Sequence, residues 1–210
     1  MSQYFEIHPT HPQPRLLKRT AETINAGGVV VYPTDSGYAM GCHIGDKAAL
    51  ERICRIRQLD QHHNFTLVCR DLSEIATYAK VGNSDYRILK GRTPGPYTFI
   101  LKATREVPRR LQHEKRKTIG IRVPAHPVAQ AMLQTLNQPL MSSSLIMPGE
   151  EWPLADPQEI RERLEHQVDL VVDGGHCPPE PTTVVDLTDQ IPRLIRRGGG
   201  DAEWIETLAQ

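Results

Sequence analysis

A run of three valines at positions 29–31 constrains the fold of this chain more than any other feature. Three adjacent β-branched residues leave no polar face, so the run predicts a strand that is buried on both sides. Pro33 lacks a backbone N–H, and we expect it to end the hydrogen-bonded ladder of this strand. The residues from Thr34 to Gly37 place hydroxyls and a carboxylate at the carboxyl end of the strand, the edge where open α/β sheets usually bind ligands. The alternative is a surface loop whose hydroxyls cap the next turn.

The overall composition favours no class of partner, because the formal net charge of the 210 residues is zero. The length allows one domain or at most two small ones, and no repeat or low-complexity linker divides the chain. No run of about 18 apolar residues occurs, so we expect no membrane-spanning helix. The first residues lack the basic start and apolar core of a secretory signal.

The cysteines and histidines do not form a metal-binding pattern. Cys42, Cys54, Cys69 and Cys177 have no C-x-x-C spacing, so we expect free thiols in a reducing cytoplasm rather than disulfides or zinc ligands. The adjacent pair His62-His63 cannot place both rings on one metal from a helix, and it predicts a polar loop. We therefore expect a cytoplasmic protein with no metal held by protein ligands alone.

Helical and strand patterns alternate along the chain, which predicts a single α/β domain with a mixed sheet. Besides the valine strand, strands are expected over residues 65–69, 97–102, 118–123, 140–146 and 168–172, and as an antiparallel pair over 183–187 and 193–196. Helices are expected over residues 14–26, 46–57, 72–76, 85–90, 127–136, 157–166 and 201–208.

Arginines and hydroxyls lie near the ends of several predicted elements. Arg55 and Arg57 lie close to the end of a helix, and residues 142–144 are three serines at the end of a strand. Thr118 and Arg122 fall on the same face of another strand, because side chains alternate along it. Guanidinium groups bind phosphate or carboxylate in bidentate fashion, so this set is typical of an oxyanion site. Alternatively, the arginines pair with an acidic residue of their own helix and the serines cap the sheet edge.

A basic segment between residues 105 and 117 is opposed only by Glu106 and Glu114. Such a local excess of positive charge favours contact with an RNA backbone, although an ordinary solvated loop has the same composition. No RNP-type aromatic pattern or K-homology loop accompanies it, and Gly198-Gly199-Gly200 is not followed by the Lys-Ser/Thr of a phosphate-binding loop. The candidate RNA-binding residues are Arg105, Arg109, Arg110, Lys115, Arg116 and Lys117.

Several motifs resemble those of one known family. Residues 32–36 (Tyr-Pro-Thr-Asp-Ser), with Tyr38 and Gly41, resemble the Y-P-T-(E/D)-T-x-(Y/F)-G-x-G signature of the YrdC family. Further matches follow in the family's order at residues 94–98, 121–124 with 126–127, 142–144 and 182–186. The resemblance covers residues 15–200 and is greatest to the YciO branch, which leaves residues 1–14 as an N-terminal extension and 201–210 as a C-terminal tail.

The resemblance implies a YrdC-like fold, a twisted mixed sheet with flanking helices around a concave, positively charged cavity. It also implies threonylcarbamoyl-AMP synthesis from L-threonine, bicarbonate and ATP with Mg²⁺, in the pathway that forms threonylcarbamoyladenosine in tRNA, and affinity for nucleotides (ATP or AMP) and for tRNA or double-stranded RNA. Carried over by motif, Thr34 and Arg122 hold threonine, and Ser144, Thr182 and Thr183 line the same cavity. The catalytic arginines are Arg55 and Arg57, and the residues that face ATP are Arg57, Asn64, Thr118 and Arg196.

Three positions depart from the synthase pattern. Arg55 replaces the lysine of K-x-R, Ile146 replaces the asparagine of S-x-N, and Cys69 stands where synthases often carry histidine. Ile146 removes an amide donor and an acceptor, and the loss of one transition-state hydrogen bond costs on the order of 10²–10³ in rate. Since we expect all three changes to lie in the pocket, the sequence favours a nucleotide- and RNA-binding relative of the synthases, with a fully active synthase as the alternative.

Overall fold

A mixed sheet of ten strands runs through the computed structural model of the chain, which describes residues 1–60 and 63–208. The strand order is β1-β8-β2-β3-β7-β4-β6-β5-β9-β10. The pairs β1–β8, β2–β8, β4–β6 and β5–β9 are parallel, and the other neighbours are antiparallel. The strands are β1 (Gln3–Glu6), β2 (Val30–Thr34), β3 (Gly37–His43), β4 (Thr66–Val68), β5 (Tyr97–Lys102), β6 (Thr118–Arg122), β7 (Leu140–Ser144), β8 (Leu170–Asp173), β9 (Thr183–Asp186) and β10 (Arg193–Arg196).

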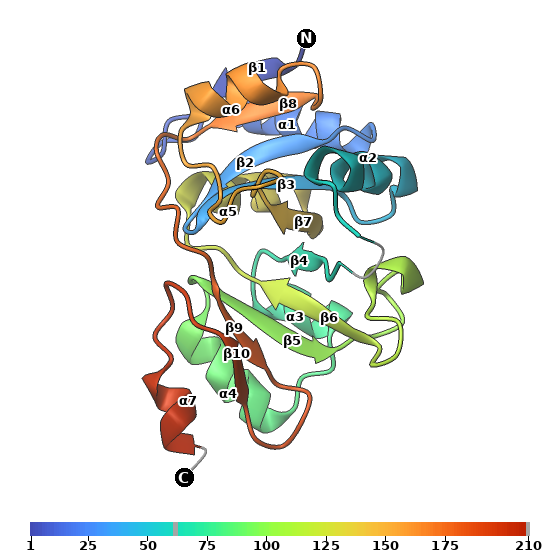
Figure 1. The fold of residues 1–210 in the computed structure, drawn as a ribbon, viewed down its shortest axis with the longest axis vertical. Helices are drawn as coiled ribbons and strands as arrows, with labels where there is room; N and C mark the ends of the chain where they lie inside the picture. The colour runs from blue at the N-terminus through green and yellow to red at the C-terminus, as the bar shows by residue number, and fades with distance from the viewer. Residues whose placement is uncertain (61–62, 209–210) are drawn as a thin grey trace.

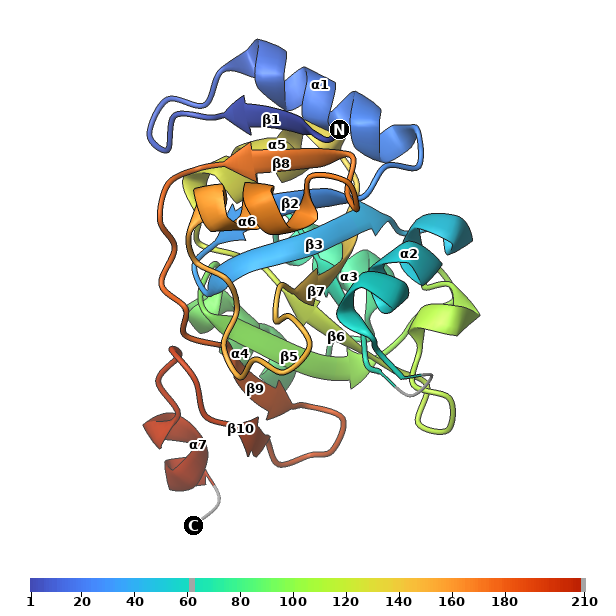
Figure 2. The ribbon, with the colours of Figure 1, turned by 45° about the horizontal axis from the view of Figure 1, so that its top comes forward.

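Helices flank this sheet (Figures 1 and 2), and in Figure 1 β1 lies at one end of the molecule and α7 at the other. The helices are α1 (Pro14–Asn25), α2 (Lys47–Arg57), α3 (Leu72–Tyr78), α4 (Asn83–Arg92), α5 (Pro127–Leu136), α6 (Pro157–Leu164) and α7 (Glu203–Leu208), with a short 3-10 helix at Arg109–Leu111. This arrangement confirms the predicted single α/β domain with a mixed sheet. None of the helices in the described ranges is both long and apolar enough to cross a membrane.

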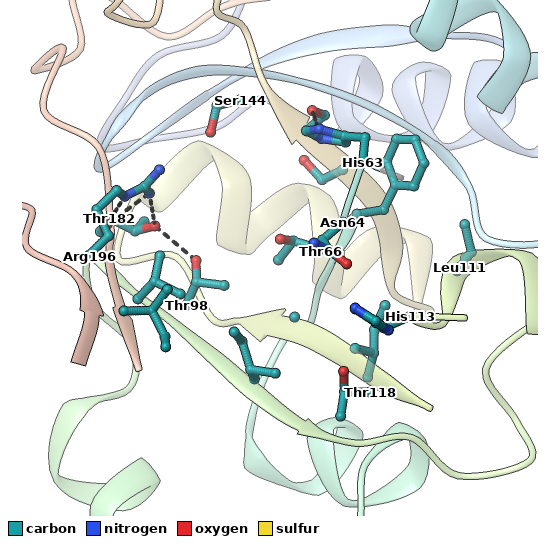
Figure 3. Close-up of a pocket in the computed structure, with 18 of the residues that line it drawn as sticks. His63, Asn64, Thr66, Thr98, Leu111, His113, Thr118, Ser144, Thr182 and Arg196 are labelled. Atoms are coloured by element: carbon teal, nitrogen blue, oxygen red, sulfur yellow. Dashed lines mark hydrogen bonds between the residues drawn. The ribbon is translucent and has the colours of Figure 1, made fainter. Parts of the chain in front are cut away.

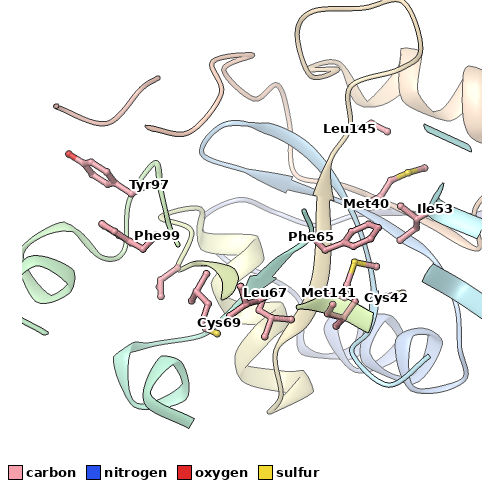
Figure 4. Close-up of a cluster of buried hydrophobic side chains, with 14 of the residues drawn as sticks. Met40, Cys42, Ile53, Phe65, Leu67, Cys69, Tyr97, Phe99, Met141 and Leu145 are labelled. Atoms are coloured by element: carbon pink, nitrogen blue, oxygen red, sulfur yellow. The ribbon is translucent and has the colours of Figure 1, made fainter. Parts of the chain in front are cut away.

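Two hydrophobic clusters hold the helices against the sheet. In one cluster, Ile24 of α1 and Met132 of α5 pack with Val30 of β2, and all three are fully buried. The other cluster packs α2, α3, α4, α6 and α7 against the sheet, from β2 and β8 to β5 and β9, and part of it is drawn in Figure 4. Burial of an aliphatic side chain of this size contributes about 1.5–3 kcal/mol, so the clusters fix which strands each helix covers.

Local signals begin and end several helices where the sequence predicts them. The Asp46 carboxylate accepts a hydrogen bond from the N–H of Ala49 at 2.8 Å and caps α2. At the carboxyl end of α5, Asn137 adopts a left-handed conformation and ends the helix. The predicted boundaries of the helix at 127–136 and the strand at 97–102 are confirmed, whereas α4 continues through Gly91, its expected stop, to Arg92.

The hairpin of β2 and β3 corrects the expectation for Pro33. The ladder continues through this residue, with Pro33 opposite Tyr38 and Thr34 opposite Gly37. On the other side of β2, only Val30 and Val31 pair with β8, so that ladder has ended before the proline is reached. A proline is tolerated there because it interrupts no β2–β8 bond.

The strands β1 and β3 were not predicted from the sequence. All of β3 up to Cys42 is buried, so its residues show no alternation of polar and apolar side chains. At the start of β3, Gly37 has a φ of +79°, and a Cβ there would lie 2.6 Å from Cγ of Pro153. Only glycine satisfies both demands. Residues 3–6 add β1 to the edge of the sheet beside β8.

Candidate functional site

A cavity of about 440 Å³ lies where β4, β5, β6, β7 and β10 approach one another, and Figure 3 shows it. Its walls come from the end of α2, the loop before β4, the carboxyl end of β7 and the residues around the 3-10 helix at Arg109–Leu111. Binding sites for small molecules in proteins commonly have volumes of about 300–1,000 Å³. The cavity therefore has the size of a ligand site.

Arg57, the last residue of α2, reaches into one wall of the cavity. Its Nε donates a hydrogen bond to the backbone oxygen of Ile146 at 3.0 Å, and its Nη1 donates to Oγ of Ser143. Ser143 Oγ lies 3.3 Å from Nε2 of His63, which belongs to the loop before β4. Burial lowers the pKa of Arg57, but a guanidinium remains charged in proteins. Its positive charge therefore lies beside the serine hydroxyl.

Arg196 of β10 and two threonines form another part of the cavity wall. Its Nη2 donates to the backbone oxygen of Thr182 at 2.9 Å, and also to the Thr182 hydroxyl at 3.2 Å. The Thr182 and Thr98 hydroxyls lie 2.9 Å apart (Figure 3). Burial lowers the pKa of Arg196 as well. This network fixes the guanidinium toward the cavity and holds two hydroxyls beside it.

Arg116 lies at the rim and belongs to the basic segment. Its Nη2 donates to the Asp186 carboxylate at 2.6 Å and to the Thr188 hydroxyl at 2.8 Å. Burial alone would raise the pKa of Asp186, but the hydrogen bonds from Thr188 and Arg116 outweigh it and bring the pKa to about 2. Asp186 therefore stays ionised and anchors Arg116 at the cavity.

The lining suits an anion. It contains three arginines and several serine and threonine hydroxyls, and none of its described residues is an Asp or Glu. Guanidinium and hydroxyl groups are strong partners for phosphate and carboxylate oxygens. No group of three or more His, Cys, Asp or Glu that could hold a metal ion occurs among the residues that the structure describes.

Six of the residues that the family resemblance assigns to the site line this one cavity, and Arg116 of the basic segment lines it too. These six come from α2, the loop before β4, β6, β7, the segment before β9, and β10, although the sequence separates them by up to 139 positions, from 57 to 196. The residues are Arg57, Asn64, Thr118, Ser144, Thr182 and Arg196. All four residues that the resemblance assigns to ATP are among them.

Two of the residues assigned to threonine lie outside that lining and have partners within the protein. The Thr34 hydroxyl donates to the backbone oxygen of Gly37 at 2.6 Å, so it caps the hairpin turn. The hydroxyl therefore caps a turn, as in the alternative given above, but Thr34 is buried in β2 and does not belong to a surface loop. The guanidinium of Arg122 forms an ion pair with the carboxylate of Asp35.

Three further residues that the sequence analysis expects in the cavity lie elsewhere in the structure. Thr183 is buried, and its hydroxyl donates to the backbone oxygen of Gly200 at 2.6 Å, so it does not line the cavity. Arg55 is exposed on α2, because its position two residues before Arg57 turns it away from the lining. Cys69 is fully buried in the hydrophobic cluster of Figure 4, where burial raises the pKa of its thiol. Of the three departures from the synthase pattern, only Ile146 lines the cavity.

The basic segment is mostly exposed, but two of its arginines contact the rest of the protein. Arg110 donates to the backbone oxygen of Ile44 at 3.2 Å, and Arg116 is held by Asp186. Arg105, Arg109, Lys115 and Lys117 are exposed. The segment therefore presents positive charge beside the mouth of the cavity.

The sequence reasoning missed His63, His113, Thr66 and Thr98 as lining residues. The sequence predicts a polar loop at His62-His63, and His63 does lie outside any helix or strand; His62 lies outside the described residues. The motif at residues 94–98 could have identified Thr98 as a site residue, because Thr98 is its last residue. No local pattern marks His63, because its partner Ser143 is 80 positions away.

Comparisons with known proteins agree with this fold and these motifs. A sequence model of the Sua5/YciO/YrdC family, described as "Telomere recombination", matches residues 22–198. The chain is 60% identical to YciO of Escherichia coli (strain K12) over 203 residues, which are 97% of this chain and 98% of that protein. The crystal structure of E. coli YciO has a TM-score of 0.93 to this structure and covers 96% of this chain and 98% of its own.

Two more distant relatives bear enzyme or ligand names. Threonylcarbamoyl-AMP synthase of Chromobacterium violaceum is 31% identical over 180 residues, 85% of this chain and 92% of that protein. Sua5 of P. abyssi, in a crystal structure with L-threonine, has a TM-score of 0.89 at 24% identity, covers 99% of this chain and 61% of its own, and shows the fold alone. The chain therefore belongs to the Sua5/YciO/YrdC family and has threonylcarbamoyl-AMP synthases among its relatives.

Proposed function

We propose that the protein binds an adenine nucleotide, ATP or AMP, in the cavity between Arg57 and Arg196. The observation that carries this proposal is the convergence of Arg57, Asn64, Thr118 and Arg196 on one cavity of about 440 Å³. The relatives named threonylcarbamoyl-AMP synthase support it, because the name describes a product that contains AMP.

The charges of the lining determine how the nucleotide would lie. Arg57 and Arg196 come from different elements of the lining, and each is already oriented by a hydrogen bond to a backbone oxygen, that of Ile146 and that of Thr182. Preoriented guanidinium groups lose little conformational entropy when they bind phosphate oxygens. The threonine hydroxyls between them can donate to the same oxygens. The apolar residues Phe65, Leu111 and Ile195 also line the cavity and offer surface to the base.

Mg²⁺ would enter with ATP rather than occupy a site of the protein. The described lining contains no carboxylate, so phosphate oxygens and water would supply most of the ligands. The protein's own residues would bind and orient the phosphates, and the metal would share their negative charge.

The test is calorimetric titration of the purified chain with ATP, AMP and adenosine, each with and without Mg²⁺. We expect ATP and AMP to bind and adenosine to bind more weakly, because adenosine lacks the phosphate that the arginines recognise. If Arg196→Ala weakens the binding of both ATP and AMP, the nucleotide binds at this cavity. Equal affinity for AMP and adenosine would contradict the proposal.

RNA binding is the second part of the proposal, and the basic segment supports it. Exposed lysines and arginines lie beside the mouth of the cavity, where Arg116 is shared by the segment and the lining. A phosphate backbone along the segment would bring a nucleotide of tRNA or double-stranded RNA close to the cavity. Such binding depends on counterion release and weakens steeply with salt.

Threonylcarbamoyl-AMP synthesis remains the alternative, and identity of 31% to a named synthase favours it. In that reaction the threonine amine bonds to the carbon of bicarbonate with loss of water, and an oxygen of the resulting carbamate attacks the α-phosphorus of ATP and expels pyrophosphate. Ile146 in the cavity and the pairing of Arg122 with Asp35 weigh against it. Pyrophosphate release that requires both L-threonine and bicarbonate would establish the synthase reaction, and its absence at high protein concentration would exclude it.

A further inference from the structure

Three side chains in the cavity form a chain of contacts that nucleotide binding does not require. Arg57 Nη1 donates to Ser143 Oγ, and Ser143 Oγ lies 3.3 Å from His63 Nε2. The three residues come from α2, β7 and the loop before β4, and all of them line the cavity. A hydroxyl within reach of an imidazole is the geometry of an activated nucleophile, and this distance is often somewhat long in structures without substrate.

The direction of the hydrogen bonds follows from Arg57. A guanidinium can only donate, so Ser143 Oγ is the acceptor of that bond. The serine's own proton is then available for His63 Nε2, which accepts it when its proton resides on Nδ1. The positive charge of Arg57 also stabilises the negative charge that develops on Oγ as this proton leaves.

His63 is suited to the role of proton acceptor. Burial and the nearby charge of Arg57 lower the pKa of His63 below 6.5, so the imidazole is neutral at pH 7. Phe65 lies edge-on against the imidazole, with ring centroids 5.0 Å apart and planes at 72°, and restricts its orientation. The neighbouring serine of β7 has a different role, since Ser142 Oγ lies 2.7 Å from the Tyr32 hydroxyl in the buried core.

From this geometry we infer that Ser143 and His63 are a nucleophile and its general base, which hydrolyse an acyl group joined to a nucleotide through an ester or mixed anhydride. In the first step, Ser143 Oγ bonds to the acyl carbon and its proton passes to His63 Nε2. The bond from that carbon to the nucleotide oxygen breaks, and this oxygen takes the proton from His63. Water then attacks the acyl-serine with His63 as base, which releases the acid and restores the serine.

The substrate class rests on the proposed nucleotide site, whereas the nucleophile does not. Arg196 and the neighbouring Thr98 and Thr182 would hold the nucleotide, and its acyl linkage would face Ser143. The experiment therefore begins with a probe that contains no nucleotide.

The test is reaction of the full chain with an alkyl fluorophosphonate, which phosphonylates activated serines with loss of fluoride, followed by peptide mass spectrometry. We expect a single phosphonyl group on Ser143, none in Ser143→Ala, and labelling slowed by about 10²-fold or more in His63→Gln. The matched control is Ser84→Ala, which removes an exposed hydroxyl at the start of α4 and should leave labelling unchanged. The labelling rate should fall only below pH 6.5, as His63 becomes protonated.

Two results would overturn the inference: no labelling of a chain whose thermal unfolding is normal, or labelling of Ser143 at the same rate in His63→Gln. Calorimetry on the same preparation separates this inference from the proposed function. If Ser143 is labelled but the protein does not bind nucleotide, Ser143 is an activated nucleophile and the proposed nucleotide function is wrong. If the protein binds nucleotide but Ser143 is not labelled, the nucleotide function stands and the inference about Ser143 is wrong. If both hold, AMP should slow the labelling of Ser143.

Discussion

The carboxylate of Asp35 and the guanidinium of Arg122 form an ion pair in the interior of the protein. Arg122 is only 6% exposed, and the other oxygen of Asp35 accepts a hydrogen bond from the N–H of Ala125 at 3.1 Å. The motif resemblance assigns Arg122 to the carboxylate of threonine. In this structure, a carboxylate of the protein itself holds that arginine.

Asp35→Asn should lower the stability of the protein and free Arg122 to bind another carboxylate. It leaves the buried charge of Arg122 without its counterion, and breaking a buried pair in this way costs about 3–5 kcal/mol of stability. Urea unfolding measures the loss. If Arg122 can also take a substrate carboxylate, L-threonine should raise the melting temperature of the variant more than that of the wild type, and threonine methyl ester should not. An equal response of both proteins to L-threonine would contradict this role of Arg122.

The variants Arg57→Ala and Arg55→Ala compare the effect on ATP affinity of an arginine in the cavity with that of an exposed arginine on the same helix. Hydrogen bonds to charged groups contribute about 1.5–3 kcal/mol, so Arg57→Ala should weaken ATP binding by about 10- to 150-fold. Arg55 is exposed and outside the lining, and its removal should change the affinity by much less. Calorimetric titration of the two variants compares them directly. A similar loss in both would mean that long-range charge, rather than contact, governs binding.

Ile146→Asn tests whether this position limits synthase activity. The side chain lines the cavity, and an asparagine there would restore an amide donor and acceptor. If the synthase reaction is otherwise intact, pyrophosphate release that depends on threonine should rise by about 10²-fold or more. The matched control is Ile195→Asn, which adds the same amide at another lining position and should give no such gain. Equal rates in wild type, Ile146→Asn and Ile195→Asn would show that position 146 is not the limit.

The stability of the protein in acid should depend on Asp186. The pKa of this carboxyl is about 2 in the folded protein and 3.8 ordinarily, so ionised Asp186 stabilises the fold by about 2 kcal/mol at neutral pH. Because the folded pKa is the lower one, this contribution is present above pH 3.8 and is lost as the pH falls toward 2. Asp186→Asn should therefore be less stable than wild type at pH 7, with the difference shrinking below pH 4.

Urea unfolding of Asp186→Asn from pH 7 to pH 2 measures this difference. Asp189→Asn is the control, since Asp189 is exposed in the bend that follows β9. A stability difference between Asp186→Asn and wild type that stays constant over this range would contradict the assignment of the pKa.

Charge reversal of Arg109, Arg110 and Lys115 to glutamate should abolish binding of tRNA or double-stranded RNA. Each contact with a phosphate releases condensed counterions, so wild-type affinity should also fall steeply between 50 and 200 mM salt, as is general for such contacts. Gel-shift titrations at several salt concentrations measure both effects. The matched control reverses three exposed charges elsewhere, Arg15, Lys18 and Lys90. Equal binding by the two triple variants would identify the segment as an ordinary solvated loop.

The sequence by itself determined the fold class and most elements, because the signals involved are local. Hydrophobic periodicity, prolines at helix starts and capping aspartates act within a few residues, and they set α5, β5 and the start of α2. The ordered motifs also identified the family. Local signals failed at β3, whose burial on both faces erases the alternation of polar and apolar residues.

Only the tertiary structure decided which polar side chains meet. Asp35 and Arg122 are 87 positions apart in the chain, and His63 and Ser143 are 80 apart. Such pairs form because the sheet brings distant strand ends and loops together, and no sequence periodicity encodes that distance. The sequence therefore predicted Arg57 and Arg196 as site residues, and both line the cavity. The tertiary packing places His63 in the lining and leaves Thr34, Thr183 and Arg55 outside it.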